Sequence, residues 1–305
     1  MIWLPLILRI TVPCINKIIV NLTIKIGAIM ATSITNAFIT QFEAEVHMAY
    51  QRMGSKLKNL VRQVNGVNGN TVKFQKIAKG SANTKARHAE VVAMDLAHSN
   101  VSATLDDFYA ADYVDKLDEL KVNIDERQVV AQSAAYALGR KTDEIVDTIF
   151  QNATALANNS SGTGTGMNLG KATAMMELFN TNDVPDDNQR YWVIGPKQWS
   201  DLLSLDQFSR AEYVGEGELP YSGGMTAKRW LGFLWFVHSG LSTSGSTDRH
   251  TVAWHKSSVG LGIGSDVKTE VNYIPEKVSH LITSMLSMGG TLIDTNGIRI
   301  QKCAE

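Results

Sequence analysis

The chain has 305 residues, of which 44% are hydrophobic and 19% are charged, and its formal net charge is −1. This composition is that of an ordinary globular protein with a sizeable core, and the near-zero charge argues against a generally basic nucleic-acid binder. The two cysteines, Cys14 and Cys303, lie near opposite ends of the chain. A disulfide framework is therefore not expected, and a reducing compartment fits the sequence.

Residues 1–29 differ from the rest of the chain because they are rich in Ile, Leu and Val and contain no acidic residue. Arg9, Lys17 and Lys25 interrupt the apolar runs, so no uncharged span is long enough for a membrane helix. In a secretory signal the positive charge precedes the apolar run, whereas Arg9 follows it. We expect an over-extended start, with translation beginning at Met30; a leader or membrane anchor and a structured arm are the alternatives.

Two elements are predicted directly after this start. Ile, Phe and Val residues about four apart predict a helix over Ser33–Met53, with Ser33 as its N-cap. The Asn-Gly pairs within 65–69 are typical of turns. Thr71–Ile77 alternates between polar and apolar residues, which predicts a strand.

A long hairpin is predicted around that strand. Residues 79–88 are polar and are expected to form a mobile tip, and Val101–Leu105 and Phe108–Val114 are expected to return beside Thr71–Ile77. An isolated hairpin is only marginally stable in water, and this one has few residues for a core. We therefore expect it to lie on the surface of a partner.

Charge is unevenly divided over this part of the chain. From Val46 to Ala89 there are nine basic residues and no acidic one, whereas Glu90 to Asp147 holds thirteen acidic and five basic residues. The basic block either binds nucleic-acid phosphates or contacts the acidic segment of a neighbouring copy. No nucleic-acid-binding motif supports the first alternative, and both signs lie in one chain, which favours the second. The expected interface residues are basic Arg52, Lys56, Lys58, Arg62, Lys73, Lys76, Lys79, Lys85 and Arg87, and acidic Asp106, Asp107, Asp112, Asp115, Asp118 and Glu119.

One long helix is predicted over Asp118–Ala157, and the other elements are expected to attach to it. Apolar residues recur at intervals of seven and four, which is the stripe of an amphipathic helix. Asp118 and Glu119 lie at the end where the helix dipole favours negative charge, and the Asn, Ser and Gly residues of 158–162 end the helix. At about 1.5 Å per residue, an unbroken helix would be roughly 50 to 60 Å long.

Short helices and strands are mixed in the second half of the chain. Helices are predicted over Lys171–Phe179 and from Pro196 onward, and four glycines predict a loop over Glu212–Met225. Strands are predicted over Arg190–Ile194, Lys228–Ser239 (as a strand pair or bend), Thr251–His255, Val267–Ser287 and Gly297–Ile300. Because strands and helices do not alternate regularly, the predicted fold class is α+β.

No local pattern indicates catalysis. Gly162–Gly166 with Gly170 and Lys171 lacks the first glycine and the final Ser or Thr of a phosphate loop, and Gly260–Gly264 lacks the third glycine of a dinucleotide-binding loop. The seven histidines are scattered, and Cys303 has no companion for a zinc site. We expect no cofactor, no metal and no enzymatic activity; an enzyme with a dispersed active site is the alternative.

The order of the predicted elements resembles the major capsid protein of tailed bacteriophages, which has the Hong Kong 97-like coat fold. An arm, a long hairpin, a long helix, a compact lobe and late strands that return to the helix follow one another from Met30 to the C-terminus. Local sequence resemblances lie in Val193–Leu203, Gly223–Ser239, Ala253–Gly262 and Gly297–Ile300. The order and lengths of the elements carry the resemblance, because no single motif is diagnostic.

The resemblance implies a division of the chain into six parts. These are a non-native or leader extension (1–29), an N-arm (30–66), an extended loop (67–116), a peripheral domain with the spine helix (117–166), an axial domain (167–264) and returning strands of the peripheral domain (265–305). It also implies a structural protein that self-assembles into an icosahedral shell enclosing phage double-stranded DNA. An encapsulin-type compartment shell shares the fold and is the nearest alternative.

Partners and location follow from the same resemblance. It implies homo-oligomers (pentamers and hexamers), a separate scaffolding protein, a portal protein, a decoration protein in some members, and packaged DNA bound without sequence specificity. No membrane partner is expected. The protein would reside in the virion after assembly in the host cytoplasm.

Overall fold

The computed structural model describes residues 51–121, 125–156, 164–210, 227–244 and 248–305. Contacts divide the chain into Met1–Val46 and His47–Glu305, and every described residue belongs to the second unit. The expectations for residues 1–29 and for the loop over 212–225 lie outside the described residues, as does all but the last part of the helix predicted over Ser33–Met53. Residues 51–53 are not helical.

The long predicted helix is present as α3, Glu126–Leu156, but its predicted start at Asp118 is wrong. The preceding strand runs to Asp115, whose carboxylate accepts the Leu117 N–H at 2.7 Å and caps a separate short helix, α2 (Lys116–Glu119). A turn closes α2, and Asp125 accepts the Gln128 N–H at 3.3 Å to begin α3. Two local caps therefore override the continuous apolar stripe. Over its 31 residues α3 is about 46 Å long.

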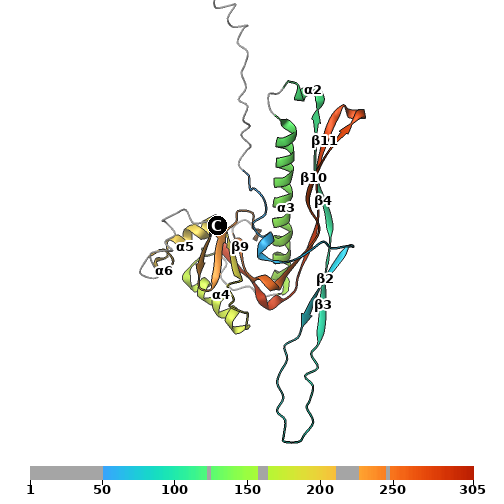
Figure 1. Ribbon diagram of the computed structural model, residues 1–305. Helices are drawn as coiled ribbons and strands as arrows, with labels where there is room; N and C mark the ends of the chain where they lie inside the picture. Colours follow the sequence, from blue (N-terminus) through green and yellow to red (C-terminus); the bar gives the residue numbers. More distant parts are fainter. Residues whose placement is uncertain (1–50, 122–124, 157–163, 211–226, 245–247) are drawn as a thin grey trace, which may run out of the picture. The chain divides into compact units, whose positions relative to one another are not determined.

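A four-stranded sheet with the order β1-β10-β11-β4 packs on α3. Figure 1 shows β10, β11 and β4 beside the helix. Its strands are β1 (Arg62–Asn65), β10 (Val259–Ile274), β11 (Ser279–Leu292) and β4 (Asp106–Asp115). Within this sheet β1 pairs with β10 in parallel, whereas β10 with β11 and β11 with β4 are antiparallel pairs. Leu286 and Met288 of β11 share a buried core with Val146 and Ile149 of α3. The strand predicted over Phe108–Val114 is therefore confirmed as β4, but it pairs with β11 and is not part of the hairpin.

The hairpin consists of β2 (Thr71–Ile77) and β3 (His98–Thr104), so the prediction of β2 is confirmed at both ends. Phe74 and Val72 of β2 lie against Gly260 and Gly262 of β10, where a Cβ atom would come within 2.7 and 2.6 Å of them. These glycines, which in the sequence resembled part of a nucleotide-binding loop, thus lie in a strand and allow the hairpin to approach the sheet. Figure 1 shows the 78–97 loop continuing beyond the paired strands.

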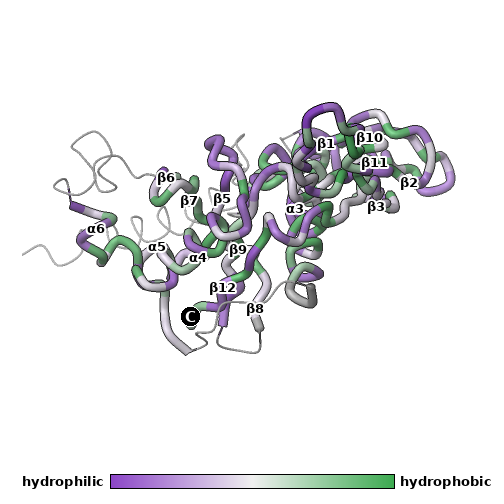
Figure 2. The backbone as a smooth tube through the Cα atoms, turned by 90° about the horizontal axis from the view of Figure 1, so that it is seen from below, coloured by the Kyte–Doolittle hydropathy of each residue, from purple (hydrophilic) through white to green (hydrophobic). Residues whose placement is uncertain are grey.

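The second lobe is built on a six-stranded sheet with β12-β9-β5-β7-β6 as its main order and β8 paired to β9. Its strands are β5 (Arg190–Ile194), β6 (Ala227–Trp230), β7 (Phe233–Val237), β8 (Thr243–Ser244), β9 (Asp248–His255) and β12 (Ile298–Ala304). Figure 2 shows β7 as a hydrophobic stretch within this sheet. The strands predicted over 190–194, 228–239, 251–255 and 297–300 are confirmed, as is the 267–287 region, which forms β10 and β11.

Two cores lie on the two faces of this second sheet. On one face Trp192 and Trp235 stack with ring centroids 4.0 Å apart, beneath α4 (Leu169–Thr181), α5 (Pro196–Leu203) and α6 (Asp206–Ser209). On the other face Val193 and Trp254 belong to the core that includes α3. Both helices predicted for this region are confirmed. The shared core packs the lobe against the long helix.

The close contact between the hairpin and β11 leads to a test. A Cβ atom on Gly289 would lie 1.9 Å from the carbonyl oxygen of Thr104. Because backbone atoms cannot move aside cheaply, Gly289→Ala is expected to lower the free energy of unfolding by about 2 kcal/mol or more. The measurement is the urea midpoint of the unassembled protein.

Gly170→Ala is the matched control. A Cβ atom there meets only the Asn168 side chain at 3.5 Å. Alanine also favours the helix by up to about 1 kcal/mol. Equal midpoints for Gly289→Ala and the wild type would contradict the close packing of the hairpin on β11.

Candidate assembly site

Residues 51–57 are the first described residues and lie along α3. They are called the arm segment here. Gly54 has φ +69° and lies against the helix, where a Cβ atom on Gly139 would be 2.7 Å from its Cα. The single glycine of the long helix thus provides the space for the arm segment. Arg140, one residue further, donates from Nη1 to the Gln51 Oε1 at 2.6 Å.

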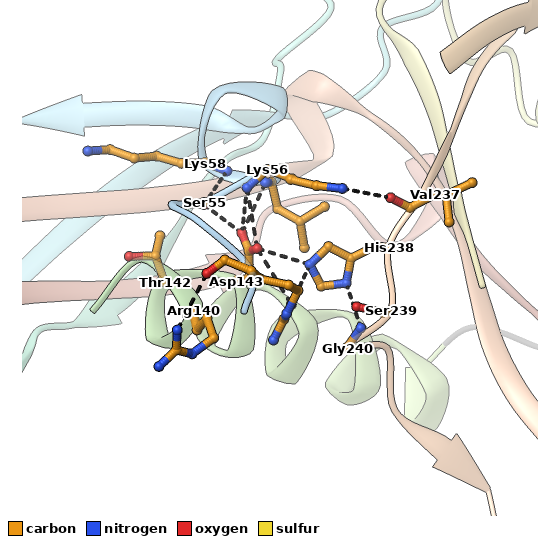
Figure 3. A network of polar contacts seen from close by, with 12 residues as sticks. Ser55, Lys56, Lys58, Arg140, Thr142, Asp143, Val237, His238, Ser239 and Gly240 are labelled. Carbon is orange, nitrogen blue, oxygen red and sulfur yellow. Dashed lines mark hydrogen bonds and ion pairs between the residues drawn. The ribbon is translucent and has the colours of Figure 1, made fainter. Parts of the chain in front are cut away.

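Asp143, one helical turn after Gly139, is the centre of a buried polar junction (Figure 3). Its Oδ1 accepts the Ser55 hydroxyl at 2.5 Å and the N–H groups of Lys56 and Leu57, each at 3.1 Å. Its Oδ2 lies 2.9 Å from Nε2 of His238, the residue directly after β7. The side chains of Asp143 and His238 are both 1% exposed. One carboxylate therefore connects the arm segment, α3 and the second lobe.

The hydrogen bonds assign the tautomer of His238. The Gly240 N–H donates to Nδ1 at 3.2 Å, so the proton of the neutral ring lies on Nε2 and is donated to Asp143. Nη1 of Arg52 lies 2.7 Å from the same Nε2. Because both of those nitrogens are then donors, this contact adds no hydrogen bond. The Asp143 carboxylate, 3.8 Å away, is what attracts the guanidinium.

Burial raises the pKa of Asp143, but hydrogen bonds from His238, Ser55 and the Leu57 N–H outweigh it, and the pKa lies below its ordinary value. A group with a lowered pKa in the folded state stabilises the fold above its pKa in the unfolded chain. That contribution is lost as the pH falls through the folded-state pKa. The junction is therefore formed at neutral pH and weakened by strong acid.

The loop between β2 and β3 exposes a mostly apolar run, Val91–Leu96, in which Asp95 is the one charged residue. Val91, Val92 and Met94 are 78%, 67% and 54% exposed. The run follows the polar stretch over 79–88, which is also exposed. Large apolar side chains clustered on a surface mark an interaction site.

A groove of about 690 Å³ lies between α3 and β4. Small and apolar residues make up most of its lining, which also includes one acid and the first residue of the arm segment. The lining residues are Gln51, Tyr109, Ala110, Ala111, Asp112, Val129, Val130, Ser133, Ala134 and Ala137. This groove and the apolar run are chemically complementary.

The structure gives four of the nine predicted basic interface residues an acidic partner within the chain. These pairs are Arg52–Asp143, Lys58–Asp266, Lys76–Asp294 and Lys79–Asp183. Lys56 donates to the Val237 carbonyl at 3.4 Å, and the Arg62 guanidinium lies 5.9 Å from the Phe74 ring centroid. Lys73, Lys85 and Arg87 are exposed. A contact between these basic residues and a neighbouring copy stays a prediction.

The predicted acidic residues divide in a similar way. Four have partners nearby in sequence: Asp112 accepts the Tyr113 N–H, Asp115 caps α2, Asp118 pairs with Lys121 and Glu119 pairs with Arg127. Asp106 and Asp107 are exposed at the start of β4 and have no partner among the described residues. β4 is an edge strand, and charged side chains are typical of unpaired edges.

The described parts of the chain contain no group of three or more His, Cys, Asp or Glu side chains placed to hold a metal ion. Lys171, of the suspected phosphate loop, is buried and donates to the carbonyls of Thr165 and Lys302 at 2.7 and 3.1 Å. Burial raises the pKa of the Cys303 thiol to about 11, which makes it unreactive. None of the helices among the described residues is long and apolar enough to cross a membrane.

The most connected residues of the junction have no signal in the sequence. Asp143 and His238 are 95 positions apart, and nothing local connects them. The apolar run was missed as well, although Val91 and Val92 follow a long polar stretch between two predicted strands. That pattern was a usable signal, because an apolar run between two strands needs either a core or a partner.

The chain is similar over most of its length to a family of known proteins and to several solved structures. Residues 34–305 match the family model described as Phage capsid protein. A solved structure from Mycobacterium phage Che8 is similar at 16% identity and TM-score 0.68, covering 87% of this chain and 97% of that one. The capsid structure of Cyanophage P-SCSP1u is similar at 16% identity and TM-score 0.70, covering 87% and 93%. The capsid of Ralstonia phage GP4 is similar at 10% identity and TM-score 0.66, covering 88% and 95%. None of the curated proteins matches the chain.

The junction at Asp143 is tested by Asp143→Asn. This substitution removes the negative charge to which the arm segment and His238 donate hydrogen bonds. The free energy of unfolding at pH 7 is therefore expected to fall by about 3 kcal/mol or more. The difference from the wild type is expected to begin to shrink below about pH 4, where the carboxylate of the unfolded chain takes up a proton, and to disappear as the pH falls through the lowered pKa of the folded state. Urea unfolding of the unassembled protein at pH 7 and pH 3 measures both effects.

Glu144→Gln is the control at the adjacent position. The Glu144 side chain is 65% exposed and pairs with Lys141 on the helix surface, so a change within about 0.5 kcal/mol is expected. Equal effects of the two substitutions at pH 7 would show that the buried junction does not contribute to stability.

Proposed function

The chain belongs to the phage capsid protein family and is a structural major capsid protein, and from this premise we propose how its copies assemble. Many copies form an icosahedral shell around double-stranded DNA, with pentamers and hexamers as the building units. Family and fold imply a structural, non-enzymatic component of the virion, and they do not favour an encapsulin-type compartment or an enzyme.

The exposed apolar run on the extended loop carries the proposal. Val91, Val92 and Met94 contribute nothing to the core of their own chain, because each is more than half exposed. The groove between α3 and β4 offers small apolar side chains that would bury them. In the proposed shell the run of one copy enters the groove of the next, and the removal of apolar surface from water drives the contact.

Charge around the proposed contact is mixed. Lys85 and Arg87 precede the apolar run by a few residues and are opposite in sign to Asp112 of the groove. Glu90 and Asp95, beside and within the run, have the same sign as Asp112. Bringing opposite charges together at the rim of an apolar contact sets its register more than its affinity. We keep the wider set of predicted basic and acidic residues as contacts between neighbouring copies, with the internally paired ones contributing less.

The remaining partners are also part of the proposal. Assembly takes place in the host cytoplasm with a separate scaffolding protein, and a portal protein completes the shell. A decoration protein is a further partner. DNA is enclosed without sequence specificity, consistent with the net charge of −1 and with the absence of a nucleic-acid-binding motif in the sequence.

Negative-stain electron microscopy tests the proposal. The wild type, alone or with its scaffolding protein, is expected to form shells or capsomer rings. Val91→Asp combined with Val92→Asp is expected to lower the assembled fraction at least about tenfold, because two charges would have to enter an apolar groove. The melting temperature of the unassembled protein is expected to stay unchanged, since both side chains are exposed.

Asn83→Asp combined with Thr84→Asp is the matched control, with the same two charges added to the polar part of the same loop. This variant is expected to assemble like the wild type. A wild-type protein that stays monomeric under every condition would disprove the assembly function. Normal assembly of the Val91/Val92 variant would disprove the role of the apolar run alone.

A further inference from the structure

A second cleft, of about 580 Å³, lies beside β1, at the opposite edge of the four-stranded sheet from β4. One wall comes from the short helix η1 (Lys58–Leu60) and from β1. The other wall comes from the start of β5 and from η3 (Lys256–Ser258). The lining residues are Asn59, Val61, Arg62, Gln63, Gln189, Lys256 and Ser257.

The cleft contains two cations and no acid. Among the described residues, neither Arg62 nor Lys256 has a carboxylate partner. The nearest acid along the chain, Asp187, is engaged by His255 at 3.0 Å and by the Gln189 N–H at 3.1 Å. The other polar lining groups are amides and the Ser257 hydroxyl, which contacts His255 Nδ1 at 2.7 Å. A cleft of this kind is suited to an anionic group, and a guanidinium binds a carboxylate or a phosphate in two-point fashion.

The chain carries anionic groups that lack a partner at the other edge of the same sheet. Asp106 and Asp107 are exposed at the start of β4. The strand registers align Asn65 of β1 with Ile263, Met288 and finally Asp106 across the four strands. Arg62 begins β1 three residues earlier, about 10 Å along the strand. Opposite charges thus lie on opposite edges of the sheet, offset by about 10 Å along the strand direction.

We propose that the cleft formed by Arg62 and Lys256 receives the Asp106 and Asp107 carboxylates of a second copy of this chain. This inference rests on the proposed function and names a second contact between neighbours. Two different surfaces meet in such a contact, so each copy offers one of each and the arrangement is head to tail. A head-to-tail contact closes into a ring when its rotation fits, as the proposed pentamers and hexamers require.

Charge reversal tests the pairing by electron microscopy and sedimentation of the full chain. Arg62→Glu with Lys256→Glu, and separately Asp106→Lys with Asp107→Lys, are each expected to lower the assembled fraction at least about tenfold, because like charges then face each other. The quadruple variant that carries both reversals is expected to regain assembly. Mixing the two double variants is expected to restore even-membered rings only, since each must alternate with the other. Unchanged melting temperatures of the unassembled proteins show that folding is intact.

Lys197→Glu with Arg210→Glu is the control, because it makes the same change in net charge at two surface pairs of the second lobe. It is expected to assemble normally. Normal assembly of both double variants would overturn this inference and leave the proposed function standing, whereas a wild type that never assembles would disprove that function itself. Failure of the quadruple variant would also overturn the pairing. Normal shells that lose only their nucleic acid in the Arg62/Lys256 variant would instead assign the cleft to phosphates.

Discussion

The carboxylate of Asp143 accepts hydrogen bonds from the arm segment and from His238, and the positions of the other parts of the chain depend on this contact. A buried charge is stable only when donors surround it, and here the donors come from segments 86 to 95 residues away. The junction therefore has one arrangement of the arm segment, the long helix and the second lobe that satisfies it. Removing any of these donors without replacing it would leave the buried carboxylate with a hydrogen bond unmade.

Close backbone approach is the second constraint. Gly139 admits the arm segment against α3, and Gly260, Gly262 and Gly289 admit the hairpin against the sheet. These contacts bring the hairpin strands onto a packed surface, so an element that is marginal in isolation acquires a core at its base. The 78–97 loop has no such support and exposes its apolar run. Stability at the base and exposure at the tip suit a segment whose partner is another molecule.

The strand order of the four-stranded sheet bears on both proposed assembly surfaces. Its order leaves β1 and β4 as edges, and both edges carry charged side chains. Charge discourages uncontrolled strand pairing. It also permits a specific contact when the two edges carry opposite signs, as Arg62 and Asp106 do. Charged side chains on the two edge strands would thus both prevent aggregation and set the head-to-tail orientation of neighbouring copies.

The sequence by itself determined the local elements: β2, β5, both predicted helices of the second lobe and most of the long helix follow from periodicity and from capping and turn residues. It also determined the fold class and the capsid resemblance through the order of those elements. The start of α3 is set by local caps at Asp115 and Asp125, which the continuous apolar stripe obscured in the sequence. Only the tertiary structure decided the pairing of β4 with β11 and the junction of Asp143 with His238. The physical reason is that both depend on groups far apart in the chain, whose desolvation and pairing are settled only when the core closes. Four of the predicted basic residues proved to be paired internally for the same reason.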